Sequence, residues 1–163
     1  MTDNMSADDD GSAADRCQRG DDFDPHNIVD QLEAIVRFLP IFEDSFFRFG
    51  EWAGGDSSSG IFTMPTFNTS EQAQAFIRAA YDAGWVYPFS WTDWIDTDEG
   101  RRLLSDPTYL AQADANQLAK LLTARIRADR FIEGGLGSDF ESGLLINILR
   151  RAAQLLEINA ALS

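Results

Sequence analysis

Apolar residues recur at helical spacing near the start of the predicted folded region, in "DPHNIVDQLEAIVRFLP". The stripe consists of Ile28, Val29, Leu32, Ile35, Val36 and Leu39. Positions three and four apart share one face of an α-helix, so this spacing predicts an amphipathic helix. Asp24 is the expected N-cap, Pro25 occupies the first helical position, and Pro40 is expected to end the helix.

The spacing of apolar residues changes in the next segments. Two short apolar and aromatic runs flank a Gly/Ser loop in "SFFRFGEWAGGDSSSGIFTMPTF", which predicts a β-hairpin. A helical pattern follows in "TSEQAQAFIRAAYDAG", with Ser70 as N-cap and Gly84 as its stop.

Aromatic residues then alternate in "GWVYPFSWTDW", as is typical of an extended segment whose side chains two apart point the same way. Pro88 restricts that segment to an edge or irregular strand. Ser90 and Asp93 resemble a capping box and predict a short helix that carries Trp91 and Trp94 three apart on one face.

The last third predicts two longer helices. Asp114 and Gln117 form a capping-box pattern for a helix from about 115 to 133, and Gly134 stands where a C-cap glycine belongs. Ser138 and Glu141 predict a second start, for a helix over about 139–159. Its polar residues form only a narrow stripe, which favours a central place in the core. That stripe consists of Asn147, Arg150, Arg151, Gln154 and Glu157.

Together these patterns predict a mainly α (α+β) fold, with one compact helical domain over residues 25–163, a small β-hairpin and an aromatic-rich segment. Hydrophobic residues make up 44% of the chain and aromatic residues 12%, enough to bury a core. Residues 1–24 instead contain eight aspartates and two arginines with few apolar side chains. This composition predicts a disordered acidic tail.

Charge and targeting signals narrow the class of protein. The net charge is −14, and residues 1–100 carry 20 acidic against 5 basic side chains, which makes a nucleic-acid partner unlikely. Lys120 is the single lysine beside twelve arginines, a balance that suits a salt-rich cytoplasm or a GC-rich genome. No apolar run reaches the roughly 18 to 20 residues of a membrane span, and no signal-peptide pattern is present, so we expect a cytoplasmic protein without membrane contact.

The segment "RADRFIEGGLGSDFESG" (residues 127–143) concentrates charge and glycine between two apolar stretches. The apolar seam of the preceding helix continues onto Arg125 and Asp129, which predicts an ion pair on the core side. Such an i, i+4 pair is worth a few tenths of a kcal/mol at a surface and needs further hydrogen bonds when buried. Glu133, Glu141 or backbone carbonyls of the turn are the candidate partners, and the favoured interpretation is a structural clasp.

Two other interpretations of this segment stay open. Free backbone N–H groups at a helix N-terminus preceded by glycines can bind an anion. Asp139 and Glu141, however, already place negative charge in this first turn. Alternatively, Asp129 and Glu133 with those two carboxylates could hold Mg²⁺ or Ca²⁺. We rank both below the clasp and predict no metal and no cofactor. The lone Cys17 also offers no disulfide or thiolate cluster.

A family resemblance rests on the same segment. The stretch "LLTARIRADRFIEGGLGSDFESGLLINILRR", together with "FGEW", "PFSWTDW" and "LLSDPTYLAQAD", resembles a prokaryotic family of unknown function, number 6508. The similarity covers about residues 28–155. Its most specific part is Arg127, Asp129, Arg130, Phe131, Glu133, Gly134, Phe140, Glu141, Ser142 and Gly143. The family implies a domain boundary and no activity.

The aromatic cluster around Trp91 admits two interpretations, a core layer or a stacking pocket for a planar ligand. No complete catalytic constellation can be assembled, since His26 is the single histidine and no triad motif is present. We therefore expect a non-catalytic protein-interaction or ligand-binding module, with a protein as the expected partner. The ligand-binding candidates are Arg125, Arg127, Asp129, Arg130, Trp91, Asp93 and Trp94.

The alternative function is an enzyme that acts on a small anionic, phosphate-bearing substrate through segment 125–143. Arg127 and Arg130 would then hold the anion, and Glu133 or Glu141 would act as acid or base.

Overall fold

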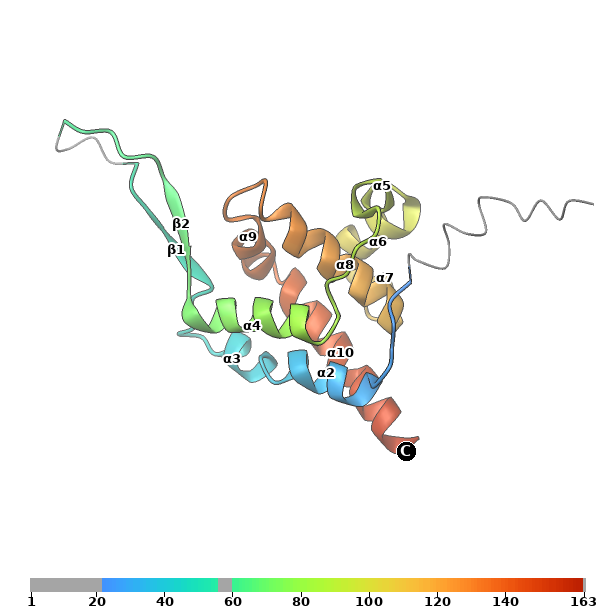
Figure 1. The fold of residues 1–163 in the computed structure, drawn as a ribbon. Coiled ribbons are helices and arrows are strands. Elements are labelled where there is room, and N and C mark those ends of the chain that lie inside the picture. The colour runs from blue at the N-terminus through green and yellow to red at the C-terminus, as the bar shows by residue number, and fades with distance from the viewer. Residues whose placement is uncertain (1–21, 56–59, 163) are drawn as a thin grey trace, which may run out of the picture.

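A body of packed helices carries a long two-stranded hairpin at one side (Figure 1). The computed structural model describes residues 22–55 and 60–162. The predicted mainly α (α+β) class with a β-hairpin is therefore confirmed. Most of the predicted acidic tail, residues 1–21, lies outside the described residues. No helix within the described ranges has the length and apolar character needed to span a membrane.

The elements follow one another in a simple order. The helices are α2 (Ile28–Val36), α3 (Leu39–Glu43), α4 (Glu71–Asp82), α5 (Trp91–Ile95), α6 (Asp98–Ser105), α7 (Pro107–Leu110), α8 (Ala115–Ala128), α9 (Gly135–Glu141) and α10 (Leu144–Ala161). The strands are β1 (Gly50–Ala53) and β2 (Thr66–Thr69).

The first helix differs from its prediction at both ends. Asp24 is not its N-cap, because α2 begins at Ile28 after Asn27. Pro40 does not end it either: α2 stops at Val36, and Pro40 lies in the first turn of α3. Proline has no backbone N–H, and the N–H groups of a first helical turn have no partner within the helix. A proline in the first turn therefore costs no helical hydrogen bond, and it can mark the start of a helix.

Both predicted ends of α4 are confirmed. Ser70 caps α4, since its side chain accepts a hydrogen bond from the Ala73 amide, and Gly84 ends that helix with a φ of +80°.

The predicted edge or irregular strand after Gly84 is wrong, because the aromatic run forms no strand within residues 85–90. Trp85 is fully buried and donates from Nε1 to the Gln31 carbonyl at 2.7 Å.

Phe23 belongs to the core, although its polar neighbours place it in the predicted tail. Its ring is 6% exposed and stacks on Trp85 with centroids 4.6 Å apart. Its backbone N–H also donates to the Asn116 side chain of α8 at 2.9 Å. The chain before α2 is thus fixed to the helical body by at least these contacts.

The last helix is the centre of the body, as its apolar circumference predicts. α10 lies against α2, α3, α7, α8 and α9. Its buried residues are Leu145, Ile148, Leu149 and Ala152. The central place applies to its first half, because Ile158 and Leu162 near its end are exposed.

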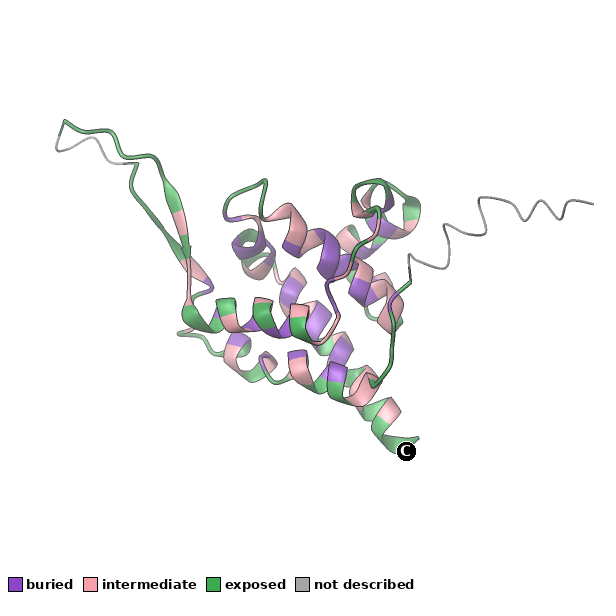
Figure 2. Cartoon of the chain, in the orientation of Figure 1, coloured by how far each residue is buried: buried purple, intermediate pink, exposed green. Residues whose placement is uncertain are grey.

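The hairpin is antiparallel, with Trp52 opposite Phe67. Its base packs against the body, where Phe49 is buried and the Phe67 ring lies so close to Gly137 that a Cβ there would be 2.6 Å away. Figure 2 shows that most of the described arm beyond this base is exposed. Its exposed large apolar residues are Trp52, Ile61, Phe62 and Met64.

Candidate functional site

The candidate site begins at the end of α8. The Asp114–Gln117 capping box that starts this helix is present, as predicted. The helix ends at Ala128 with Asp129 as its C-cap, five residues before the predicted end at Glu133. A turn then runs to Gly134, whose φ of +75° is the left-handed conformation that glycine adopts without strain.

An additional short helix follows that turn, and it overturns one prediction. Ser138 and Glu141 do not cap a long helix, because both lie within α9. The long helix α10 starts at Leu144, after Gly143 with a φ of +89°. Two left-handed glycines therefore delimit α9, where the residue pattern alone predicts one continuous helix.

Arg125 forms its ion pair with Asp139 of α9, and the predicted pair with Asp129 is wrong. Arg125 Nε donates to Asp139 Oδ2 at 2.7 Å, and Arg125 Nη2 donates to Asp139 Oδ1 at 2.9 Å. The Asp139 side chain is 10% exposed. This two-pronged arrangement matches the planar guanidinium to the carboxylate and joins α8 to α9.

Burial raises the pKa of Asp139 above its ordinary value, an effect that the hydrogen bonds and charge of Arg125 only partly offset. Asp129 adds a smaller rise through its own negative charge. The carboxyl group is thus held in the interior by its partner on α8, and loss of that partner would leave the carboxylate without compensation.

The other acidic residues of the turn bind backbone N–H groups. Asp129 Oδ1 accepts from the Leu136 amide at 2.8 Å, and Glu133 Oε1 accepts from the Phe67 amide of β2 at 2.8 Å. Glu141 is exposed at the end of α9. Asp129, Glu133 and Asp139 therefore hold the turn, α9 and the hairpin base together, which supports the predicted clasp.

These contacts also bear on the carboxylate metal site considered from the sequence. Within residues 22–55 and 60–162, no group of three or more His, Cys, Asp or Glu side chains is arranged to hold a metal ion. Asp129 and Glu133 point to different backbone amides, and Asp139 faces a guanidinium.

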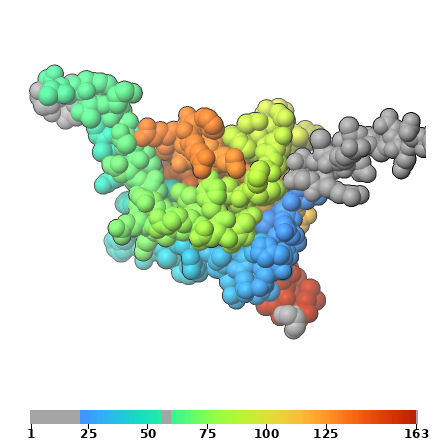
Figure 3. Space-filling view, viewed as in Figure 1, coloured from blue at the N-terminus to red at the C-terminus, as the bar shows by residue number. Residues whose placement is uncertain are grey.

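A hollow of about 540 Å³ lies between α5 and the end of α8. It is lined by Trp91, Thr92, Arg127, Arg130 and Phe131. The space-filling view shows a notch in the same place, between the orange turn after α8 and the yellow-green segment around α5 (Figure 3). Three of the predicted ligand-binding residues, Trp91, Arg127 and Arg130, thus meet at one pocket.

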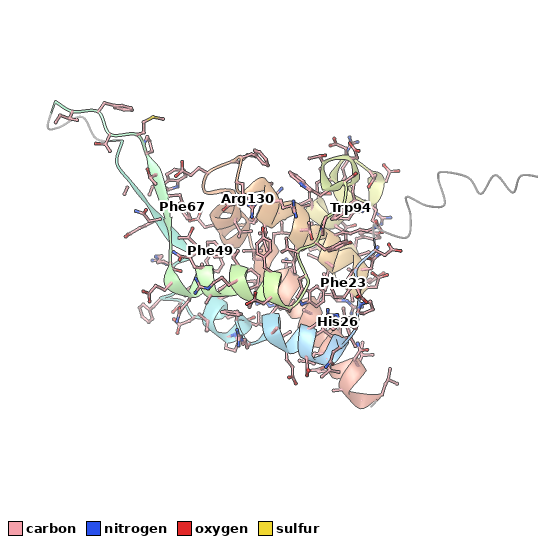
Figure 4. All side chains as sticks on the ribbon, in the orientation of Figure 1. Phe23, His26, Phe49, Phe67, Trp94 and Arg130 are labelled. Carbon is pink, nitrogen blue, oxygen red and sulfur yellow. The ribbon has the colours of Figure 1, made fainter. Side chains whose placement is uncertain are left out.

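The two arginines of this pocket differ in their contacts. Arg127 Nε is shielded from solvent and has no hydrogen-bond partner in the part of the chain that the structure describes. Arg130, labelled in Figure 4, is exposed. Its Nη2 donates to the Tyr81 hydroxyl at 2.9 Å. Tyr81 belongs to α4, so Arg130 is directed by a third helix.

The remaining predicted residues lie elsewhere. Trp94 is buried and donates from Nε1 to Glu99 Oε2 at 2.8 Å, which agrees with the core interpretation of this ring. Asp93 is exposed on α5 and does not line the pocket. The predicted capping box fails here, because the Ser90 side chain makes no cap hydrogen bond to α5.

Glu99, beside Trp94, was not singled out from the sequence. Burial acts to raise the pKa of Glu99, but hydrogen bonds from Trp94 and Gln117 and the charge of Lys120 together lower it below its ordinary value. Gln117 is also the capping-box residue of α8. Glu99 therefore fastens α6 to α5 and α8.

Two residues that line the pocket, Phe131 and Thr92, are not among the predicted site residues. Phe131 is 80% exposed, and its ring faces Trp91 with centroids 6.5 Å apart at 28°. An apolar ring in a charged turn is a sequence signal that could have marked Phe131 as a site residue. Its partner Trp91, however, lies forty residues earlier in the chain. The packing of α5 on α8 is what brings them together.

Comparison with known proteins identifies the family. A model described as a family of unknown function, DUF6508, matches residues 28–158. The match covers most of the chain, so the chain belongs to this family, and the resemblance found in the sequence is confirmed. Curated proteins and solved structures give no match.

Proposed function

We propose that this member of the DUF6508 family is a non-catalytic ligand-binding module, and that a small anionic ligand binds in the pocket between α5 and the end of α8. The pocket combines two guanidinium groups with an apolar wall from Trp91 and Phe131. Concave sites with a few convergent polar groups on apolar walls are typical of small-molecule binding.

One observation carries this proposal: Arg127 lines the pocket, and its buried Nε has no acceptor among the described residues. A buried donor without an acceptor costs about 1–3 kcal/mol, so folded proteins rarely leave one unpaired. An anionic oxygen is the acceptor that a guanidinium binds most strongly. The slightly larger hollow between α2 and α10 is lined instead by Asp30, Glu33 and aliphatic groups beside Arg37, and no unpartnered buried side-chain atom lines it among the described residues.

The contacts favour binding over the alternative of an enzyme. Glu133, a proposed acid or base, already accepts the Phe67 amide at the hairpin base. Glu141 stands at the far end of α9 and does not line the pocket. Neither carboxylate is therefore available beside Arg127 for proton transfer, which needs hydrogen-bond reach.

Calorimetric titration with inorganic phosphate and acetate tests the proposal. We expect binding by the wild type and its loss in Arg127→Met, which removes the guanidinium but keeps a long apolar side chain. Arg101→Met on α6 is the matched control, because Arg101 is exposed and does not line this pocket. Equal binding by wild type and Arg127→Met, or none by the wild type up to 10 mM anion, roughly the weak limit of specific affinity, would refute it.

A second candidate function, contact with a partner protein, is favoured by the exposed arm. Ile61, Phe62 and Met64 present apolar side chains to solvent, and residues 49–77 contain acidic but no basic side chains. We propose as occupant a protein with an apolar cleft bordered by lysine or arginine. A second copy of this chain is disfavoured by its net charge of −14.

A photoreactive phenylalanine analogue at position 62, in cells that produce the protein, tests the arm. We expect a light-dependent adduct with a protein that has a basic contact surface, and a yield that falls as salt is raised. The same analogue at position 46, where Phe46 is also exposed, is the control. Equal adducts from both positions, or an adduct between two copies, would contradict a basic partner for the arm.

A further inference from the structure

We infer that the ligand of the α5–α8 pocket carries a planar aromatic ring, which stacks on the aromatic wall of Trp91 and Phe131 while its anionic group binds Arg127. This inference rests on the proposed function and names the class of ligand within it. The anionic group is a carboxylate or a phosphate, because both offer two oxygens to a guanidinium.

The two rings together form an aromatic wall of the pocket. Their centroids are 6.5 Å apart and their planes differ by 28°, which is within the range of ordinary offset aromatic pairs. The buried stack of Phe23 on Trp85 has its centroids at 4.6 Å, so Trp91 and Phe131 cover less of each other than those two rings do. A planar ligand ring can therefore stack on this wall.

The exposure of Phe131 supports the same occupant. Its ring is 80% exposed, whereas Trp91 opposite is only partly exposed and packs against the core. A planar ligand would remove apolar surface of both rings from water. A saturated group of equal size would cover less of that surface, because it has no flat face to stack on a ring.

The positions of the charges give the ligand its polarity. Arg127 lies in the last turn of α8, and Arg130 lies two residues after the end of this helix. Phe131 follows Arg130 directly and lines the same pocket. A ligand whose ring lies against Phe131 therefore presents its substituent to the guanidinium groups. Arg130 is held by Tyr81, while Arg127 Nε still lacks an acceptor among the described residues.

Paired probes of equal charge and similar size test the inference by calorimetry. Phenyl phosphate is compared with cyclohexyl phosphate, and benzoate with cyclohexanecarboxylate. We expect the aromatic member of at least one pair to bind about tenfold more tightly to the wild type. In Trp91→Leu this ratio should fall to about one while both members still bind. Phe62→Leu, an aromatic change on the arm away from the pocket lining, should keep the wild-type ratio.

The outcomes separate this inference from the proposed function. Equal affinity for aromatic and saturated probes, with both lost in Arg127→Met, overturns the aromatic ligand but leaves an anion-binding pocket. A tenfold preference that survives in Trp91→Leu also overturns it, because the ring would then bind elsewhere. If none of the four probes nor inorganic phosphate binds the wild type, the proposed function itself fails.

Discussion

Replacing Arg125 with methionine should destabilise the fold strongly, because it leaves the Asp139 carboxylate without its partner. The Arg125 and Asp139 side chains are 23% and 10% exposed, and two hydrogen bonds join them. Breaking a buried ion pair by removing one partner costs about 3–5 kcal/mol, and the partial exposure of Arg125 places this pair near about 3 kcal/mol. For a chain of this size that corresponds to a midpoint lowered by roughly 6–12 °C.

The pH dependence of this loss has a definite sign. Burial already raises the pKa of Asp139 in the folded state, and removal of Arg125 removes the effect that opposes the rise. A carboxyl group with a raised folded pKa contributes its full stability below its unfolded pKa, and this stability is lost as pH rises through the folded pKa. The cost of Arg125→Met should therefore be small near pH 3.8, the ordinary value for Asp139, and reach its full size at neutral pH.

Urea unfolding followed by circular dichroism, at several pH values, measures this free energy. Arg127→Met is the matched control, the same substitution two residues away, and it should cost less than about 0.5 kcal/mol because Arg127 Nε has no partner to lose among the described residues. Arg125→Met combined with Asp139→Leu should recover most of the loss. A cost below about 1 kcal/mol at pH 7, or equal costs for the two arginines, would refute the clasp.

Three further predictions concern other parts of the body. Glu99→Gln should lower stability by less than about 1 kcal/mol at pH 7, since Glu99 is partly exposed. Because the pKa of Glu99 is lowered, that difference should be fully present above its ordinary value of 4.5 and should shrink as pH falls below it towards the folded pKa, which unfolding at pH 7 and pH 3 would reveal. Gly100→Ala should cost about 2 kcal/mol in urea unfolding, because its Cβ would lie 2.5 Å from the Trp94 carbonyl oxygen. Gly143→Ala should cost about 1 kcal/mol in the same assay, since φ is +89° but nothing lies within 4 Å.

Local patterns in the sequence predicted much of the fold. The cap at Ser70, the stop at Gly84 and the capping box at Asp114 each depend on residues within a few positions, and all three are present. The predicted helix boundaries around α9 are wrong, although the sequence marks Gly134 as a helix end. Two left-handed glycines nine residues apart decide that region, and a glycine by itself does not reveal which conformation it adopts.

Contacts between distant segments were beyond the sequence. Asp129 lies four residues after Arg125, which is the spacing of an ion pair along a helix. The observed ion pair is instead between Arg125 and Asp139 of α9. In the same way, Phe23 has polar neighbours in the chain and still stacks on Trp85. The sequence predicts Trp91, Arg127 and Arg130 as ligand-binding residues from separate patterns, and only the packing of α5 on α8 brings them to one pocket.

The charged segment 125–143 is both a clasp and a candidate site, because α8 directs neighbouring arginines to different helices. Residues two apart on an α-helix are separated by about 200°, so Arg125 faces α9 while Arg127 faces α5. In the clasp, Asp139 binds Arg125 and Asp129 accepts a hydrogen bond from a backbone amide. Neither carboxylate therefore neutralises Arg127. An acidic chain that leaves this one buried guanidinium nitrogen unpaired among its described residues bears a cost in stability, and an anionic ligand is the group that would remove it.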